Sequence, residues 1–189
     1  MEYRQYIDFL HKIEKLKCHT RHSWNSEGKR ESVAEHSWRL ALMAMLVGDE
    51  FPELDLNKVI RMCIIHDLGE SFTGDIPAFD KQSDHRILEQ QRLNGWIETF
   101  PEPAKTQFEQ LLAEMNAMET DEARLYKALD NLEAVIQHNE SDISTWLPLE
   151  YDLQLTYGAD KVGFSPYLQK LKAEIDCVTR RKIAEEGKR

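Results

Sequence analysis

Residues 55–70 read DLNKVIRMCIIHDLGE, a helical pattern that ends in two adjacent polar residues. Asp55 is a good N-cap residue, and the apolar residues after it recur at the spacing of a buried helix face. His66 and Asp67 follow this apolar run directly, so each polar side chain needs a partner that offsets its desolvation. A structural ion pair would serve, and a bound cation would satisfy both side chains at once.

Working outward from this pair, residues of metal-binding type recur on two other predicted helices. His36 follows Ser32-Val-Ala-Glu, a capping-box pattern that places the histidine in a first helical turn. Asp130 lies beside a leucine stripe, at the margin of a buried helix face. Each residue alone is more often a hydrogen-bonded histidine or a solvated aspartate. Together, two imidazoles and two carboxylates suit the coordination sphere of one divalent cation. We expect four ligands: His36, His66, Asp67 and Asp130.

Two more acidic residues follow the pair and could manage protons. Glu70 lies four residues after His66, so on a continuous helix it projects from the same face and reaches a metal-bound water. Asp75 follows Gly74 on the loop that leaves this helix, and loops beside a rigid helix often carry catalytic side chains. The alternative for Asp75 is an ordinary turn aspartate.

Two basic residues could bind an anionic substrate. Arg21 lies in a polar stretch predicted to be a loop, and its planar guanidinium can bind two phosphate oxygens at once. Lys127 lies one helical turn before Asp130 and could face the same cavity. The alternatives are a surface arginine and a solvated lysine.

Composition and charge narrow the class of protein. The chain has 189 residues, of which 41% are hydrophobic, and this suits one soluble globular domain spanning 1–189. A formal net charge of −10 argues against a nucleic-acid polymer or an anionic membrane as partner, because both bind excess positive charge. No apolar run approaches the length of a membrane span, and the N-terminus lacks a signal-peptide pattern, so we expect a cytoplasmic protein. The three cysteines, Cys18, Cys63 and Cys177, form no C-x-x-C motif and read as reduced thiols.

The hydrophobic periodicity is helical along nearly the whole chain, and no strand-like alternation is found. We therefore predict an all-α, single-domain bundle of seven or eight helices. Besides the helices that begin at Ser32 and Asp55, the pattern predicts helices at about 3–17, 83–99, 103–118, 120–139 and 166–185, with a short helix within 148–157.

Four local motifs together resemble the HD-domain metal-dependent phosphohydrolases, whose ligand pattern is H…HD…D. They are SVAEHS at 32–37, IIHDLGE at 64–70, TGDIP at 73–77 and KALD at 127–130. Within this superfamily the chain is most similar to the bacterial 5′-deoxynucleotidase branch and its eukaryotic relatives. The resemblance is specific over about 5–140, whereas 141–189 match loosely, as a C-terminal helical extension.

The resemblance implies an all-α HD-type fold and one divalent ion, Mn, Co, Fe, Zn or Mg, held by the four expected ligands. It implies hydrolysis of the 5′-phosphate of ribo- or deoxyribonucleoside monophosphates to nucleoside and phosphate. Arg21, with Lys127 beside it, would bind this substrate, and Glu70 and Asp75 would manage the protons of the water and of the leaving group. A homodimer is also implied, and the aromatic segment 146–167 could supply its contacts or simply pack on the bundle.

Departures from other branches narrow the substrate. Ser71 stands where alarmone hydrolases have a second acid, and the Gly-Tyr-Pro of cyclic-dinucleotide phosphodiesterases is missing. Only His85 lies between the pair and Asp130, which favours one metal ion over two. His22 stands where the bacterial deoxynucleotidases place a tryptophan, so the choice between deoxyribose and ribose stays open. Two alternatives remain: a phosphodiesterase or pyrophosphohydrolase of the same fold, and a regulatory protein that binds metal or nucleotide without turnover.

Overall fold

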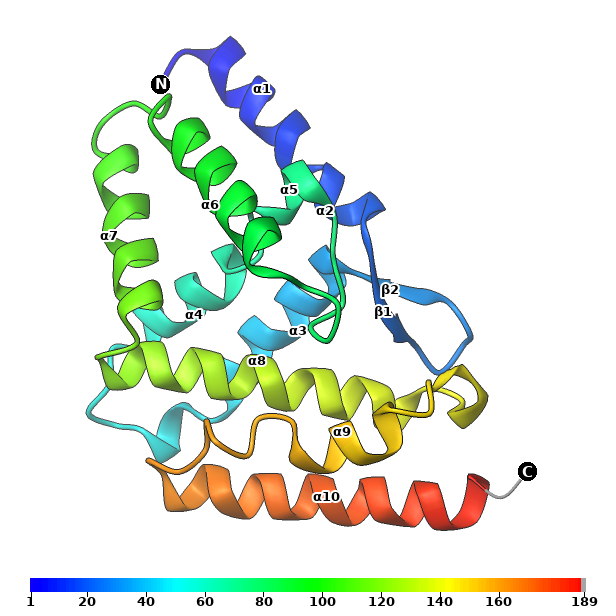
Figure 1. Cartoon of the computed structure of the whole chain (residues 1–189). Helices are drawn as coiled ribbons and strands as arrows, with labels where there is room; N and C mark the ends of the chain where they lie inside the picture. The colour runs from blue at the N-terminus through cyan, green and yellow to red at the C-terminus, as the bar shows by residue number, and fades with distance from the viewer. Residues whose placement is uncertain (188–189) are drawn as a thin grey trace.

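The computed structural model describes residues 1–187, and helices dominate it (Figure 1). Its elements in chain order are α1 Tyr3–Ile13, α2 Lys15–Cys18, β1 Thr20–Trp24, β2 Arg30–Ser32, α3 Val33–Leu46, the 3-10 turn η1 Gly48–Glu50, α4 Leu56–Ile65, α5 Glu70–Thr73, α6 Ser83–Ile97, α7 Ala104–Ala117, α8 Asp121–Glu140, the 3-10 turn η2 Ile143–Thr145, α9 Glu150–Thr156 and α10 Pro166–Glu186. The all-α prediction is confirmed, and each predicted helix is present with bounds shifted by a few residues. The described residues form ten α-helices, more than the seven or eight expected, because the helix predicted at 3–17 is divided into α1 and α2 and because the single turn α5 is a separate helix.

One segment corrects the sequence analysis. The stretch predicted to be a loop around Arg21 is an antiparallel hairpin, in which Thr20 pairs with Ser32 and Trp24 with Arg30. Its turn is built by Asn25, whose Oδ1 accepts hydrogen bonds from the backbone N–H groups of Glu27 and Lys29. Gly28 adopts a positive φ of 77° in this turn, a conformation that favours glycine. The strands have too few residues for an alternating pattern to stand out from the surrounding polar sequence.

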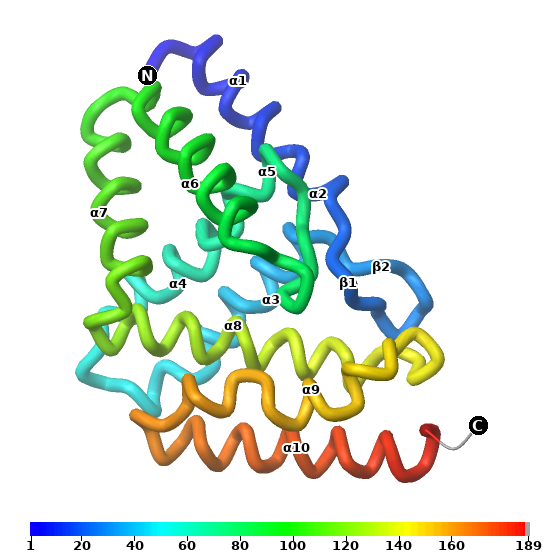
Figure 2. Tube along the Cα trace, viewed as in Figure 1, coloured from blue at the N-terminus to red at the C-terminus, as the bar shows by residue number. Residues whose placement is uncertain are grey.

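Helix α8 is the central element of the packing. Figures 1 and 2 show it crossing the molecule between α10 on one side and α3 and α4 on the other. It is the longest helix before α10, and its inward face is fully buried along several turns, at Leu125, Leu129, Leu132 and Val135. A helix with such a face is held by its neighbours more than by its own propensity. The site residues that α8 carries are therefore fixed relative to α3 and α4.

The predicted capping box is confirmed and sets where α3 begins. Ser32 Oγ accepts a hydrogen bond from the Glu35 backbone N–H at 3.2 Å, and Glu35 Oε2 accepts one from the Ser32 backbone N–H at 2.7 Å. These contacts satisfy two groups that a helix start leaves without partners. They place His36 in the first full turn, on the side of α3 that faces α8.

The C-terminal segment packs on the rest of the bundle. Trp146 is buried, and its Nε1 donates a hydrogen bond to the His138 carbonyl at 3.1 Å. Tyr157 and Tyr167 are partly buried against the hydrophobic core. These three aromatic residues therefore pack on the bundle, which is one of the two roles considered for 146–167. Among the described residues, no helix is both long enough and apolar enough to span a membrane.

Truncating Leu129 to alanine should destabilise the fold strongly, because the leucine is fully buried at the centre of α8. The expected loss is about 2–5 kcal/mol in the free energy of unfolding, measured by urea denaturation. Leu88→Ala is the matched control, since Leu88 is 42% exposed on α6, and it should cost less than about 1 kcal/mol. Equal losses in the two variants would contradict the central role of α8.

Candidate metal centre and pocket

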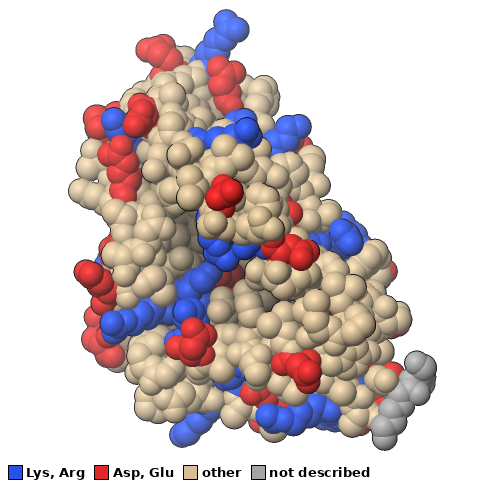
Figure 3. Space-filling view, in the orientation of Figure 1, with Lys and Arg blue, Asp and Glu red and all other residues tan. Residues whose placement is uncertain are grey.

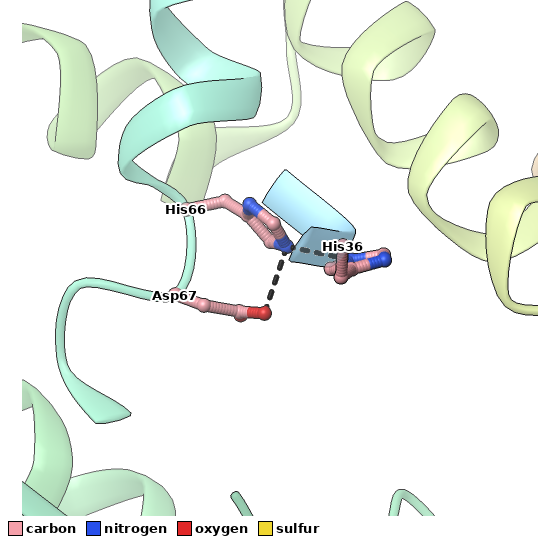
Figure 4. A group of neighbouring side chains, drawn as sticks. All are labelled: His36, His66 and Asp67. Atoms are coloured by element: carbon pink, nitrogen blue, oxygen red, sulfur yellow. Dashed lines mark hydrogen bonds and ion pairs between the residues drawn. The ribbon is translucent and has the colours of Figure 1, made fainter. Parts of the chain in front are cut away.

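Three helices bring the four expected metal ligands together. His36 comes from α3, His66 and Asp67 follow the end of α4, and Asp130 comes from α8. The Nε2 atoms of the two histidines lie 3.2 Å apart, and His66 Nε2 lies 2.9 Å from Asp67 Oδ2. Asp130 Oδ1 lies 3.1 Å from His36 Nε2 and 3.5 Å from His66 Nε2. Figure 4 shows the side chains of His36, His66 and Asp67 pointing toward one another.

Hydrogen bonds behind the histidines set their tautomers. His66 Nδ1 lies 2.8 Å from the Cys63 carbonyl oxygen, which can only accept, so Nδ1 carries the proton. His36 Nδ1 lies 2.5 Å from Glu133 Oε2. Burial opposes ionisation of Glu133, but His36 and the nearby arginines hold the pKa of its carboxyl below the ordinary value, so the carboxylate accepts from Nδ1. In both neutral rings the lone pair is therefore on Nε2, directed at the other ring.

This arrangement fits a cation. Ligand atoms of His36, His66 and Asp67 all lie within 4.8 Å of one another, and Asp130 Oδ1 adds a second carboxylate oxygen beside the two rings. These electron-rich atoms repel one another unless a positive charge lies between them. Burial opposes a charge on His66, yet Asp67 and Asp130 raise the pKa of its imidazole to about 10. The His66 imidazole thus tends to take up a proton when no metal ion is bound. A proton bridges only two of these atoms, whereas a divalent metal ion can bind all four.

A second buried group, Glu31, His36 and Glu133, also brings three potential ligand atoms together. Its carboxylates already have positive partners. Arg21 Nε lies 3.2 Å from Glu31 Oε2, and Arg39 Nε lies 3.5 Å from Glu133 Oε1. Burial and the charge of Glu133 still raise the pKa of Glu31, so Arg21 compensates its charge only in part. We interpret this second group as the one that orients Arg21 and His36.

Sequence reasoning missed both of these glutamates. Glu133 lies three residues after Asp130 on α8, and this spacing on one helix face is the signal that would have found it. Glu31 lies on β2, in a segment read as a loop, and nothing in its neighbours along the chain points to Arg21 or Ser23 as its partners.

A pocket with a cavity of about 520 Å³ opens beside the four candidate metal ligands, and Asp67 and Asp130 line it. Figure 3 shows this face hollowed near its middle, with lysine and arginine side chains gathered at the opening. Five basic residues line the pocket, namely Arg21, Lys81, Arg86, Lys127 and Lys161. Five acidic residues line it as well, namely Asp67, Glu70, Asp75, Asp130 and Glu150. The pocket is thus balanced in charge, although the chain as a whole carries −10.

The two predicted substrate-binding residues both line this pocket. Arg21 is on β1, and its Nη1 lies 3.6 Å from Asp67 Oδ2. Burial opposes its charge, but Asp67 and Glu31 raise the pKa of the guanidinium further above its usual range, so it stays charged. Lys127 Nζ donates to Asp130 Oδ2 at 2.6 Å. One oxygen of Asp130 thus accepts from the Lys127 ammonium, and the other oxygen faces His36 and His66.

Glu70 reaches the pocket by a different route from the one predicted. Helix α4 ends at Ile65 and the chain turns, with the Glu70 backbone N–H bonded to the Asp67 carbonyl at 3.0 Å, so Glu70 begins the separate helix α5. The prediction of one continuous helix through Glu70 is wrong, because the chain tightens into overlapping turns after α4. The side chain is nevertheless buried at the pocket wall, and only its Oε1 has a partner, Lys81 Nζ at 3.4 Å.

Both predicted acid–base residues hold their protons more tightly than usual. Burial, with the charges of Asp67 and Asp75, raises the pKa of Glu70 to about 9. Burial also raises the pKa of Asp75, and the nearby charge of Arg21 opposes that change. Asp75 follows Gly74, whose positive φ of 76° turns the chain back toward the pocket. Glu70 can therefore carry a proton near neutral pH, and Asp75 holds its proton to a higher pH than an exposed aspartate does.

His22, the residue that departs from the resemblance, forms part of the pocket wall beside Arg21. Its ring meets Phe79 edge to face at 5.6 Å between centroids, and its Nε2 lies 3.5 Å from Glu150 Oε2. Glu150 is buried and accepts from His138 Nε2 at 2.9 Å and from the Leu147 backbone N–H at 2.7 Å. This part of the pocket wall is aromatic and polar.

A family model described as HD domain matches residues 13–172. The chain belongs to the HD domain family. The resemblance inferred from the sequence is therefore confirmed, and the match extends past the motif-bearing part of the chain into α10.

Proteins with similar sequences and structures agree with this membership. A 5′-deoxynucleotidase of Dictyostelium discoideum is 32% identical over 145 residues, covering 71% of this chain and 76% of that protein. A 5′-deoxynucleotidase of Bos taurus is 28% identical over 187 residues, covering 96% of this chain and 89% of that protein. A solved structure from Magnetospirillum magnetotacticum, named a predicted metal-dependent phosphohydrolase, superposes with a TM-score of 0.79 at 26% identity, covering 95% of this chain and 93% of that one.

The substitution Glu133→Gln should weaken metal binding by about 10- to 100-fold, because the amide is a poorer acceptor for His36 Nδ1 and no longer balances the charge behind the site. Competition with a chromophoric chelator measures the affinity. Glu140→Gln is the matched control, since Glu140 pairs with Arg39 at 2.7 Å at the surface. Unchanged affinity in the Glu133 variant would contradict its orienting role.

The raised pKa of Glu70 predicts how stability of the metal-free protein depends on pH. The carboxyl ionises near 4.5 in the unfolded chain and near 9 in the folded one, so folding takes up a proton between these values. Stability contributed by Glu70 is therefore lost as the pH rises from 4.5 toward 9. Glu70→Gln removes this dependence, and urea unfolding of both proteins should show the variant gaining on the wild type as the pH rises. A constant difference between them would show that Glu70 is not protonated.

Proposed function

We propose that this protein is a metal-dependent phosphomonoesterase that hydrolyses the 5′-phosphate of deoxyribo- or ribonucleoside monophosphates to nucleoside and phosphate. The observation that carries the proposal is the approach of two histidine Nε2 atoms to Asp67 and Asp130, the two carboxylates that line a pocket together with Arg21 and Lys127. The 5′-deoxynucleotidase of Dictyostelium discoideum, which is 32% identical to this chain over 145 residues, supports the same reaction.

The proposed ligands of one divalent ion are His36, His66, Asp67 and Asp130. A mixed nitrogen and oxygen set suits Mn²⁺, Co²⁺, Fe²⁺ or Zn²⁺, and Mg²⁺ less well. When bound, such an ion would add positive charge to the balanced pocket, polarise a phosphoryl oxygen and lower the pKa of a water molecule.

Arg21 is the proposed main phosphate ligand. Glu31 and Asp67 hold its guanidinium from two sides, at 3.2 Å and 3.6 Å, so its orientation is set before substrate arrives. A planar guanidinium fixed in this way can donate two parallel hydrogen bonds to a phosphate. Lys127, at the edge of the same floor, would add a second positive charge toward the substrate. The two cations offset the repulsion between a phosphate dianion and an incoming nucleophile.

Glu70 and Asp75 are the proposed proton-handling residues. Their raised pKa values allow one to donate a proton to the departing sugar 5′-oxygen and the other to accept one from the attacking water. A substrate with a good leaving group separates these roles. Replacing the residue that acts as the acid should reduce activity on p-nitrophenyl phosphate much less than activity on a nucleotide. Replacing the residue that acts as the base should reduce activity on both substrates.

Three further parts of the proposal concern the whole chain. We propose that it acts as a single HD-type domain, because the family model reaches from α1 to α10 and α8 packs on helices from both ends. We propose a cytoplasmic location, supported by the three free cysteines. We also propose a homodimer as the working form.

Phosphate release from the full set of ribo- and deoxyribonucleoside 5′-monophosphates tests the function. The protein is stripped of metal and each divalent ion is then restored in turn. Release from monophosphates is expected, with no hydrolysis of cyclic dinucleotides, phosphodiesters or pyrophosphates. Hydrolysis confined to those other substrates would make the protein a phosphodiesterase or pyrophosphohydrolase, and nucleotide binding without turnover would make it a regulatory protein.

The substitution Glu70→Ala should leave metal content intact and lower kcat by about 10²- to 10⁴-fold, the range expected when a proton-transfer group is removed. Asp67→Ala is the comparison, since removing a proposed ligand should also remove the metal. Metal analysis and kinetics on the same preparations check both. Full activity in the Glu70 variant would refute its role, and full metal retention in the Asp67 variant would refute the ligand set.

A further inference from the structure

Two buried side-chain amides line the pocket without partners. Asn131 on α8 is 7% exposed and Gln154 on α9 is 4% exposed, and both line the pocket beside the candidate metal ligands. Asn131 Oδ1 is buried without a hydrogen-bond partner, and the Gln154 carboxamide has none among the described residues. Gln137, another buried amide on α8, instead donates to the Trp24 carbonyl and accepts from Arg39 Nη1, both at 2.8 Å. Because an unpaired buried amide costs free energy, the two pocket amides point to a ligand that enters the pocket.

Helix α9 holds Gln154 beside α8. Figure 1 shows α9 running back along α8 in the opposite direction. The start of α9 is tied to α8 where Glu150 Oε1 accepts from His138 Nε2 at 2.9 Å. Past its end, Gly158 lies so close to α8 that a Cβ there would come within 2.9 Å of Asn131 Cβ. Gln154 is midway along the chain between these two contacts, so its position relative to α8 is fixed from both sides.

The pocket-facing residues of α8 show which part of a nucleotide would reach Gln154. Lys127, Asp130, Ala134 and His138 line the pocket at helical spacing, so they form one row along the helix. At a rise of 1.5 Å per residue, His138 lies about 12 Å beyond Asp130 along the axis. The proposed phosphate ligand Lys127 is at the Asp130 end. A nucleotide whose phosphate is bound there extends its sugar and base along this row, past the small side chain of Ala134.

Aromatic side chains complete this part of the pocket. His22 and Phe79 both line it and meet edge to face at 5.6 Å between ring centroids, and Tyr157 lines it one turn after Gln154 on the chain. Aromatic rings stack with the face of a nucleobase. A carboxamide presents a donor and an acceptor side by side, which pairs with the edge of a base. The combination suits a planar heterocycle better than a sugar alone.

We propose that Gln154 and Asn131 recognise the nucleobase of the substrate, and that Gln154 both donates to the base edge and accepts from it. The inference rests on the proposed function, since it takes the phosphate to lie at the Arg21 and Lys127 end of the pocket. A phosphate monoester without a base would leave both amides unpaired. A site built to hydrogen-bond its substrate discriminates strongly against an analogue that lacks the matching groups. Gln154 thus determines specificity for nucleotides over sugar phosphates.

The substitution Gln154→Met tests this role, because methionine keeps the length of the side chain and removes both hydrogen-bonding groups. The measurement is kcat/KM on adenosine and 2′-deoxyadenosine 5′-monophosphates, and on ribose and 2-deoxyribose 5-phosphates, which are the same substrates without the base. We expect kcat/KM to fall about 10- to 100-fold on the nucleotides, the range for a lost pair of hydrogen bonds to a base, and to stay unchanged on the sugar phosphates. Gln107→Met is the matched control, since Gln107 is exposed on α7 and outside the pocket, and it should change neither.

The outcomes separate base recognition from support of the fold and from the proposed reaction. Equal losses on nucleotides and sugar phosphates would overturn the inference, because Gln154 would then act on the fold or on the phosphate end. Unchanged activity on nucleotides would overturn it too. Calorimetric binding of adenosine and 2′-deoxyadenosine, which carry no phosphate, tests the same contact without turnover, and the variant should bind both more weakly than the wild type. If no nucleotide releases phosphate, the proposed function fails, and this titration still decides the role of Gln154: equal nucleoside affinities, or no binding to the wild type, would refute it.

Discussion

The hydrogen bond between His36 Nδ1 and Glu133 Oε2 is the constraint on which the site depends. It joins α3 to α8 across 97 residues of sequence inside a fully buried space. It leaves the His36 lone pair on Nε2, where it meets the lone pair of His66. Two features of the fold hold this arrangement: the packing of α8 against α3 and α4, and the capping box that starts α3. A shift of either helix by one turn would separate the two rings.

Charge compensation explains how so many ionised groups stay buried together. Arg21 is held between Asp67 and Glu31, and Arg39 reaches from Glu133 to Glu140 at the surface. An isolated buried charge would cost several kcal/mol, so each carboxylate needs such a partner. At the candidate metal site Arg21 lies 3.6 Å from Asp67 and Lys127 contacts Asp130, while the two Nε2 atoms face each other at 3.2 Å with no basic side chain between them. This crowding of electron-rich atoms is what would favour a bound cation there.

The sequence predicted those features that depend on neighbours along the chain. The capping box at Ser32 and the apolar run before His66 are local patterns, and the helices they mark are present in the structure. The hairpin was missed because its pairing is made between short strands joined by a turn. Glu31 was missed because its partners come from another strand, and Glu70 lies on a new helix because a local turn interrupts α4. Long-range partners of this kind leave no periodic signal.

Anomalous diffraction from crystals grown with Mn²⁺ or Zn²⁺ tests the central claim most directly. The account predicts one peak per chain, at coordination distance from His36 Nε2, His66 Nε2 and carboxylate oxygens of Asp67 and Asp130, about 2.0–2.2 Å away. A peak between Glu31 and Glu133, on the Nδ1 side of His36, would contradict it. A metal peak elsewhere in the chain, with no peak between the Nε2 atoms of His36 and His66, would contradict it as well.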